Sequence, residues 1–239
     1  MPQRKSTVLV TRKLGGEQIA LARNLGLELI IEPALDFEFP PYWDKVLAVV
    51  NEHRKAGWVF TSRNAVHALE EMMQRGLQVM KDRQVYAVGQ KTKAELEKLG
   101  IKAQSPLIQD GSHLADLIVN DKEVESVVYF RGNLSRREMS DKLEKAAVTV
   151  YEVEVYRTVK QKLNLPEKVI DAAVFYSPSA VDAFADSGGF ERDLPYLFAI
   201  GPTTAQHLRT FTDQGVEVAD EPNTEVLLRN IADELNSRT

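Results

Sequence analysis

The segment FTSRNAV, residues 60–66, has a near copy further along the chain in FYSPSAV, residues 175–181. Each copy begins with an aromatic residue that closes an apolar run, and its Ser opens a helical pattern. The two copies lie 175 − 60 = 115 residues apart, and the motifs AVG (87–89) and AIG (199–201) lie 199 − 87 = 112 apart. Motifs repeated in one order at nearly one spacing predict an internal duplication.

Short apolar runs alternate with helical patterns along most of the chain. The runs span residues 7–11, 27–31, 58–61, 85–88, 127–130, 172–176 and 197–200. Buried strands that alternate with helices predict the α/β class, with parallel sheets covered on both faces. The carboxyl ends of all strands in such a sheet lie along one edge.

Two segments depart from this pattern. ALDFEFPP (34–41) and VTVYEVEV (148–155) alternate apolar with polar residues. Such alternation is typical of half-exposed antiparallel strands rather than buried parallel ones. We predict that the two segments pair as a ribbon between two domains.

Composition narrows the class of protein. The 239 residues suffice for two domains, and 30 basic against 35 acidic residues without a basic run argue against nucleic acid as a partner. The absence of Cys excludes disulfides and thiolate chemistry. No apolar run reaches the roughly 18 residues of a membrane span, and no signal peptide is recognisable. We therefore expect a cytoplasmic protein that does not enter membranes.

Polar residues follow several of the predicted strands, where helices begin. Ser and Thr at such positions cap free N–H groups, and the same N–H groups attract carboxylates or phosphates. Taken singly, each position is explained by a plain helix cap. Taken together at one edge of each sheet, they predict a site for a ligand with many carboxylates. The candidates are Arg12, Ser62, Thr92, Arg131, Ser177, Ser179, Thr203 and Thr204.

Familiar catalytic motifs are missing. The chain has no G-x-G-x-x-G fingerprint, no phosphate-binding loop and no G-x-S-x-G elbow. Its four His residues show no metal-ligand spacing. The sequence therefore predicts neither a metal nor a nucleotide cofactor.

The motifs together resemble the uroporphyrinogen-III synthases over nearly the whole chain. The two most specific are FYSPSAV (175–181) and AIGPTTA (199–205). The others are VLVTR (8–12), FTS with NAV (60–66), AVG with Thr92, Arg131-Gly132 and VYR (155–157).

The resemblance implies a fold that periodicity alone does not supply. It consists of two flavodoxin-like parallel-sheet domains joined by a two-stranded antiparallel β-ribbon. The first domain would be discontinuous, with residues 1–35 plus 160–239, and residues 40–152 would form the inserted second domain. The ribbon would fall at 34–41 and 148–158.

The resemblance also implies a reaction. The family's substrate is hydroxymethylbilane, a linear tetrapyrrole with eight carboxylates, which loses water and closes with ring D inverted. The enzymes use no cofactor. Carried over by motif, Tyr156 would be the general acid, and the candidates named above would contact carboxylates. The resemblance favours a monomer, and a transient contact with hydroxymethylbilane synthase stays open.

Two alternatives remain. A non-catalytic two-domain module that binds a small anion would share the hinged α/β architecture. A nucleotide-dependent transferase is weakened by the absent glycine fingerprint. Formation of the type III product from hydroxymethylbilane distinguishes an enzyme from a binding module.

Overall fold

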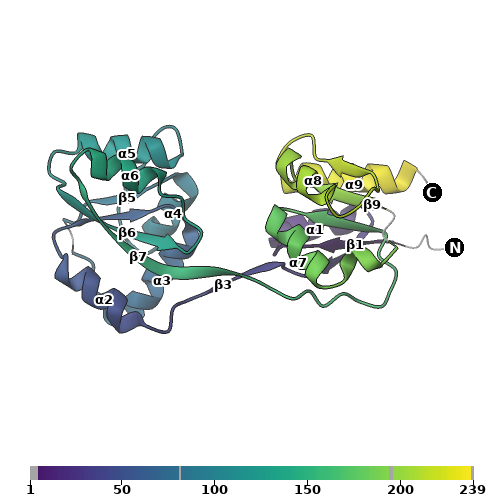
Figure 1. Cartoon of the computed structure of the whole chain (residues 1–239), viewed down its shortest axis with the longest axis horizontal. Helices are drawn as coiled ribbons and strands as arrows, with labels where there is room; N and C mark the ends of the chain where they lie inside the picture. The colour runs from purple at the N-terminus through teal and green to yellow at the C-terminus, as the bar shows by residue number, and fades with distance from the viewer. Residues whose placement is uncertain (1–4, 81, 194–195, 238–239) are drawn as a thin grey trace. The chain divides into compact units, whose positions relative to one another are not determined.

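The chain passes twice between two separately folded units. In the computed structural model, which describes residues 5–80, 82–193 and 196–237, unit 1 comprises Met1–Asp36 with Val159–Thr239. Unit 2 comprises Phe37–Thr158 (Figure 1). Unit 2 is therefore one continuous stretch inserted into unit 1.

Unit 1 is built on a parallel five-stranded sheet. Its order is β10-β9-β8-β1-β2, and each neighbouring pair for which the register is known runs parallel. The strands are β1 (Ser6–Val10), β2 (Leu27–Ile31), β8 (Ala172–Phe175), β9 (Tyr196–Ala199) and β10 (Val216–Val218). The helices are α1 (Gly16–Asn24), α7 (Pro178–Asp186), α8 (Pro202–Leu208) and α9 (Thr224–Ser237), with a short 3-10 turn, η1, at Gly189–Glu191.

Both faces of this sheet are buried by helices. Side chains alternate between the faces of a strand, so Leu9 packs with α7 and α8. Val8 and Val10 pack with α1 and α9 on the other face. The continuous apolar sequence of β1 follows from this two-sided burial.

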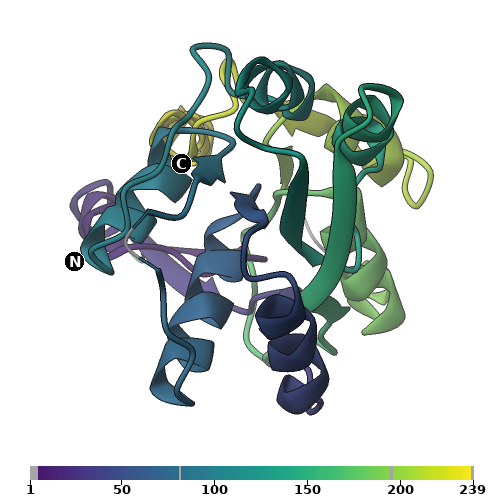
Figure 2. The same cartoon turned by 90° about the vertical axis from the view of Figure 1, so that its left-hand side faces the viewer.

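Unit 2 contains a second five-stranded sheet, in the order β3-β7-β6-β4-β5. Its strands are β3 (Leu35–Glu38), β4 (Gly57–Phe60), β5 (Val85–Ala87), β6 (Ser126–Gly132) and β7 (Thr149–Lys160). Its helices are α2 (Trp43–Glu52), α3 (Arg63–Gln74), α4 (Gln90–Lys98), α5 (Gly111–Asn120) and α6 (Glu138–Lys145). Helices again cover both faces, with α2 and α3 on one and α5 and α6 on the other (Figure 2).

Residues 148–155, predicted to pair with 34–41 in an antiparallel ribbon, also make a parallel pairing with a buried strand, which the alternation in their sequence does not indicate. β7 pairs with β6 in parallel from Thr149 to Tyr156. The alternation in its sequence arises because Glu152 and Glu154 are only partly buried, whereas Val153 and Val155 lie in the core. β3 lies next to β7 at the edge of the sheet.

Both sheets have the strand order of flavodoxin-like folds, which confirms the predicted fold class. Unit 1 reads β2-β1-β8-β9-β10, the 2-1-3-4-5 order. Unit 2 reads β5-β4-β6-β7-β3, with the first strand of the unit in the last position. The strand order reverses between β1 and β8 in unit 1, and between β4 and β6 in unit 2. Ligands of such folds bind outside the carboxyl ends of the strands at this reversal.

No helix in the described part of the chain is long and apolar enough to cross a membrane. No three of its His, Asp and Glu side chains gather where they could hold a metal ion.

Candidate functional site

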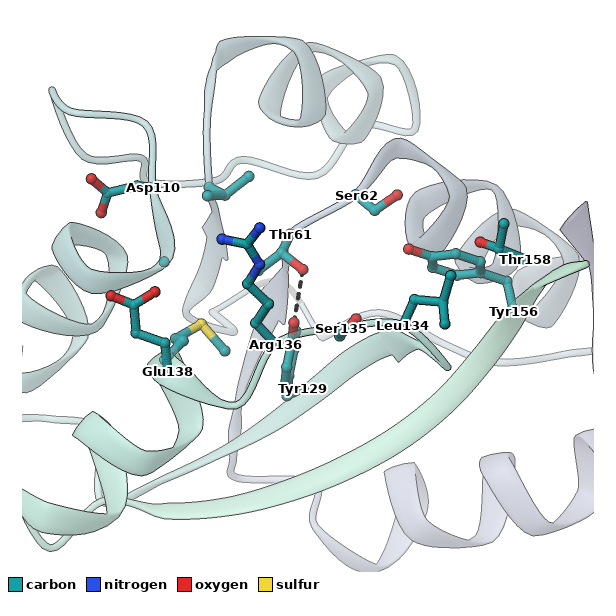
Figure 3. A pocket seen from close by; sticks show the side chains of 13 residues that line it. Thr61, Ser62, Asp110, Tyr129, Leu134, Ser135, Arg136, Glu138, Tyr156 and Thr158 are labelled. Carbon is teal, nitrogen blue, oxygen red and sulfur yellow. Dashed lines mark hydrogen bonds between the residues drawn. The ribbon is translucent and has the colours of Figure 1, made fainter. Parts of the chain in front are cut away.

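A polar cavity of about 360 Å³ lies in unit 2 where β4, β6 and β7 end (Figure 3). This is the place at which the strand order reverses, so the fold itself favours a ligand there. The residues that line it are Thr61, Ser62, Val88, Asp110, Gly111, Tyr129, Leu134, Ser135, Arg136, Glu138, Met139, Tyr156 and Thr158.

Tyr156 reaches the cavity because β7 carries a bulge. Arg131 of β6 pairs with Glu154, whereas the next residue, Gly132, pairs with Tyr156, so Val155 has no partner in the register. A bulge of this kind redirects the side chain that follows it. The Tyr156 ring lies directly on Gly132, where a Cβ atom would come within 2.4 Å of the tyrosine Cζ.

The phenol of Tyr156 is held at its ring and free at its hydroxyl. The ring of Phe37 packs edge-on against it, with 5.9 Å between ring centroids. The hydroxyl makes no hydrogen bond to any residue that the structure describes, and it points into the cavity (Figure 3). It can therefore donate a proton to a ligand.

A hydrogen bond joins two other hydroxyls of the cavity wall. Thr61 Oγ1 lies 2.9 Å from the phenol oxygen of Tyr129 (Figure 3), a side chain that is almost fully buried. The neighbouring Ser62 caps α3, and its Oγ accepts the N–H of Asn64 at 3.1 Å. Ser62 is thus both the helix cap and a cavity residue.

The charges along the cavity are unevenly distributed. Among the described residues that line it, Arg136 is the one cation, and Asp110 and Glu138 are the acids. Asp110 caps α5 and accepts the backbone N–H of His113 at 2.8 Å, with the His113 ring also 2.8 Å away. This backbone hydrogen bond, followed by the ring, lowers the pKa of Asp110. The carboxylate is therefore ionised at neutral pH.

Arg131, predicted to bind substrate, instead forms an ion pair inside unit 2. Its Nη1 lies 2.9 Å from Glu152, and both side chains are about four-fifths buried. The Oγ of the buried Ser140 donates to the same carboxylate at 2.7 Å. Arg131 does not line the cavity.

Thr92, the remaining predicted residue of unit 2, is buried in the first turn of α4. Its backbone N–H already donates to Gly89. Of the four residues predicted in this unit, the structure therefore brings Ser62 and Tyr156 to the cavity and leaves Thr92 and Arg131 outside it.

The residues predicted in unit 1 lie at the carboxyl ends of β1, β8 and β9. The guanidinium of Arg12 is exposed and stacks 4.7 Å above the Tyr176 ring, at the reversal of that sheet. Ser177 caps α7 and accepts the N–H of Ala180 at 3.2 Å. Ser179 is half-buried in the same helix.

The last two predicted residues lie in the first turn of α8. Thr203 is exposed there, whereas Thr204 is buried. The exposed polar groups of unit 1 thus come from three neighbouring strands of its sheet.

Sequence reasoning missed Arg136, Tyr129 and Thr158. Arg136 follows a strand end in RGNLSRRE (131–138), but the local sequence does not show that its role differs from that of the adjacent Arg137. Tyr129 lies within a buried strand, where its hydroxyl gives no sequence signal.

The fold and the cavity define a class, a pair of flavodoxin-like units with a polar site at the strand reversal. The family model described as "Uroporphyrinogen-III synthase HemD" matches residues 17–229. The chain belongs to this family.

Individual relatives agree with the family match. The chain is 29% identical over 218 residues to the uroporphyrinogen-III synthase of Chlorobaculum parvum, a match that covers 83% of this chain and 87% of the relative. The crystal structure of uroporphyrinogen-III synthetase from Helicobacter pylori is similar with a TM-score of 0.62, at 20% identity, over 97% of this chain and 99% of that one. A mutant uroporphyrinogen III synthase from Thermus thermophilus gives a TM-score of 0.61, at 17% identity, with the same coverage of both chains. At these identities the two structures support the fold alone.

Proposed function

We propose that this chain catalyses the reaction of its family, the closure of hydroxymethylbilane to uroporphyrinogen III with loss of water and inversion of ring D. It is then a cyclising lyase that works without a cofactor. The observation that carries the proposal is the family match over residues 17–229. The polar cavity at the strand reversal of unit 2 supports the proposal that part of the substrate binds there.

Tyr156 is the proposed general acid. The C–O bond of the hydroxymethyl group breaks as a pyrrole nitrogen donates its electron pair, and the phenol proton passes to the leaving oxygen, which departs as water. The substituted α-carbon of ring D attacks the resulting azafulvenium-like cation and forms a spirocyclic intermediate. The older bond from that carbon to the methylene of ring C then breaks, which leaves a second such cation on ring C. The unsubstituted α-carbon of the inverted ring D closes on this cation, and the proton that this carbon loses restores the phenol. A positioned proton donor contributes about 10²–10⁴-fold to such a step. The free hydroxyl of Tyr156 supports this role.

Carboxylate binding is the second requirement of this substrate. Ser62 in unit 2 and Arg12, Ser177, Ser179 and Thr203 in unit 1 are polar groups at carboxyl edges of the sheets, as such binding needs. We assign Thr92, Arg131 and Thr204 to the stability of the fold, because their side chains are buried or paired.

The test is the isomer that the protein produces. Purified protein is incubated with hydroxymethylbilane made enzymatically in the same vessel, and the type I and type III products are separated. Type III product supports the proposal. If only the type I isomer of spontaneous closure forms, the chain is a binding module or an inactive relative.

Two further expectations follow from the family and stay proposals. We place the reaction in the cytoplasm and expect a monomer. Sedimentation of the purified protein tests the monomer, and sedimentation with added hydroxymethylbilane synthase tests a contact with that enzyme.

A further inference from the structure

The end of β6 and the loop that follows it carry three arginines within seven residues, Arg131, Arg136 and Arg137. We propose that Arg136 alone among them binds a carboxylate of the substrate. This inference rests on the proposed function, since it names a contact that the substrate makes in the cavity of unit 2.

Two of these three arginines, Arg131 and Arg137, form ion pairs with carboxylates of the protein. Arg131 is held by Glu152 at 2.9 Å. Arg137 lies 3.2 Å from Asp141 and 3.6 Å from Glu144 on α6. These guanidinium groups are committed to carboxylates of the protein, and neither residue lines the cavity.

Arg136 differs in both respects. It lines the cavity, and its guanidinium has no ion pair or hydrogen bond within residues 5–80, 82–193 and 196–237. An Arg presents a fork of N–H donors that matches a carboxylate, so an unpaired Arg in a polar cavity is suited to an anionic ligand.

Hydrogen bonds hold the backbone that leads into Arg136. The N–H of Gly132 donates to Ser135 Oγ at 3.1 Å, and the N–H of Ser135 returns to the Gly132 carbonyl at 3.2 Å. The side chain of Asn133 bonds both the N–H and the carbonyl of Thr158, at 2.9 and 3.3 Å. The two bonds of Asn133 tie the loop to β7, the strand that carries Tyr156.

The charges around Arg136 determine on which side of its guanidinium a substrate carboxylate would bind. Figure 3 shows the Arg136 guanidinium between the carboxylates of Asp110 and Glu138 and the hydroxyls of Ser62 and Tyr156. Like charges repel an anion from the acidic side. A substrate carboxylate on Arg136 therefore lies on the hydroxyl side, towards Ser62 and Tyr156.

The test compares Arg136→Gln with Arg137→Gln, a matched control on the adjacent residue. Charge-assisted hydrogen bonds support an increase in KM of roughly tenfold for R136Q, with kcat changed less than about twofold. R136K recovers part of the loss. R137Q leaves KM within about twofold, and thermal unfolding of R136Q matches wild type because the Arg136 guanidinium has no ion pair or hydrogen bond to lose among the described residues.

A binding measurement separates this inference from the proposed function. Uroporphyrin III, a fluorescent tetrapyrrole with eight carboxylates, is titrated into each variant. Weaker binding by R136Q than by R137Q supports the carboxylate contact even if wild type forms no type III product. If wild type forms type III product and R136Q keeps the wild-type KM and affinity, the inference is wrong and the proposed function stands.

Discussion

Gly132 and Tyr156 face each other across β6 and β7 so closely that a Cβ atom on Gly132 would overlap the tyrosine ring. The built Cβ lies 2.4 Å from Cζ, 2.5 Å from Cε2 and 2.8 Å from the phenol oxygen. Glycine is needed here for close approach of a ring, not for an unusual backbone angle. This contact decides where the proposed acid lies.

Gly132→Ala is therefore expected to move Tyr156 and to lower kcat at least tenfold. Forcing a methyl group into a filled space also costs about 1–3 kcal/mol of stability. Steady-state kinetics and urea unfolding measure the two effects. Gly16→Ala is the control, because no atom lies within 4 Å of its added Cβ. Wild-type kcat in G132A would show that the ring position is not critical.

Tyr156→Phe keeps the ring on Gly132 and removes only the proton donor. We expect kcat to fall at least tenfold with a native fold, and KM to change little, because the loss concerns the transition state. The isomer assay measures this, and Tyr42→Phe, at an exposed phenol outside the cavity, serves as control. Unchanged turnover in Y156F would remove the assignment.

Arg131→Met tests the structural role of the ion pair with Glu152. Loss of Arg131 leaves the largely buried Glu152 carboxylate with the hydroxyl of Ser140 and, at 3.9 Å, the exposed guanidinium of Arg137. We therefore expect the free energy of unfolding to drop by about 1–3 kcal/mol and KM to stay within about threefold. Lys98→Met breaks a pair with Glu95 in which the lysine is mostly exposed, and should cost under about 0.5 kcal/mol. A tenfold rise in KM at unchanged stability would return Arg131 to the substrate contacts.

Asp110→Asn tests the charged cap of α5. The folded pKa of Asp110 is below its ordinary value of 3.8, so the carboxylate stabilises the folded state above that pH. This stability is lost as pH falls through the lowered pKa. Asn caps helices well without a charge, so wild type should be more stable than D110N at pH 6, and the difference should vanish towards acid. Unfolding from about pH 2.5 to 6 measures it, and a difference independent of pH would contradict this account.

Local sequence sufficed for the parallel sheets and for several helix starts. The apolar run predicted at 172–176 forms β8 (Ala172–Phe175), and Ser177 with Pro178 opens α7, because caps and proline act over a few neighbouring residues. The pairing of β7 could not be obtained in this way. In the sequence, Glu152 suggests an exposed strand face, but in the structure it forms a largely buried ion pair with Arg131 of the neighbouring strand. Local sequence does not indicate such a contact between strands.

The candidate site was predictable only in part. Tyr156 came from a family motif, but its orientation depends on a bulge at Val155 that no local pattern indicates. Arg136 and Arg137 look alike in sequence. They differ because α6 presents Asp141 and Glu144 to the second of them, which depends on the loop geometry.

The insertion of unit 2 into unit 1 has a consequence for synthesis on the ribosome. β1 pairs with β8, whose first residue is Ala172, so the first strand waits for more than 160 residues of further translation. Val8, Leu9 and Val10, fully buried in the folded chain, stay without that partner strand during this time. All residues of unit 2 have been made by Thr158. The middle of the chain is thus the part able to fold first, and the nascent amino terminus is where a chaperone would be most useful.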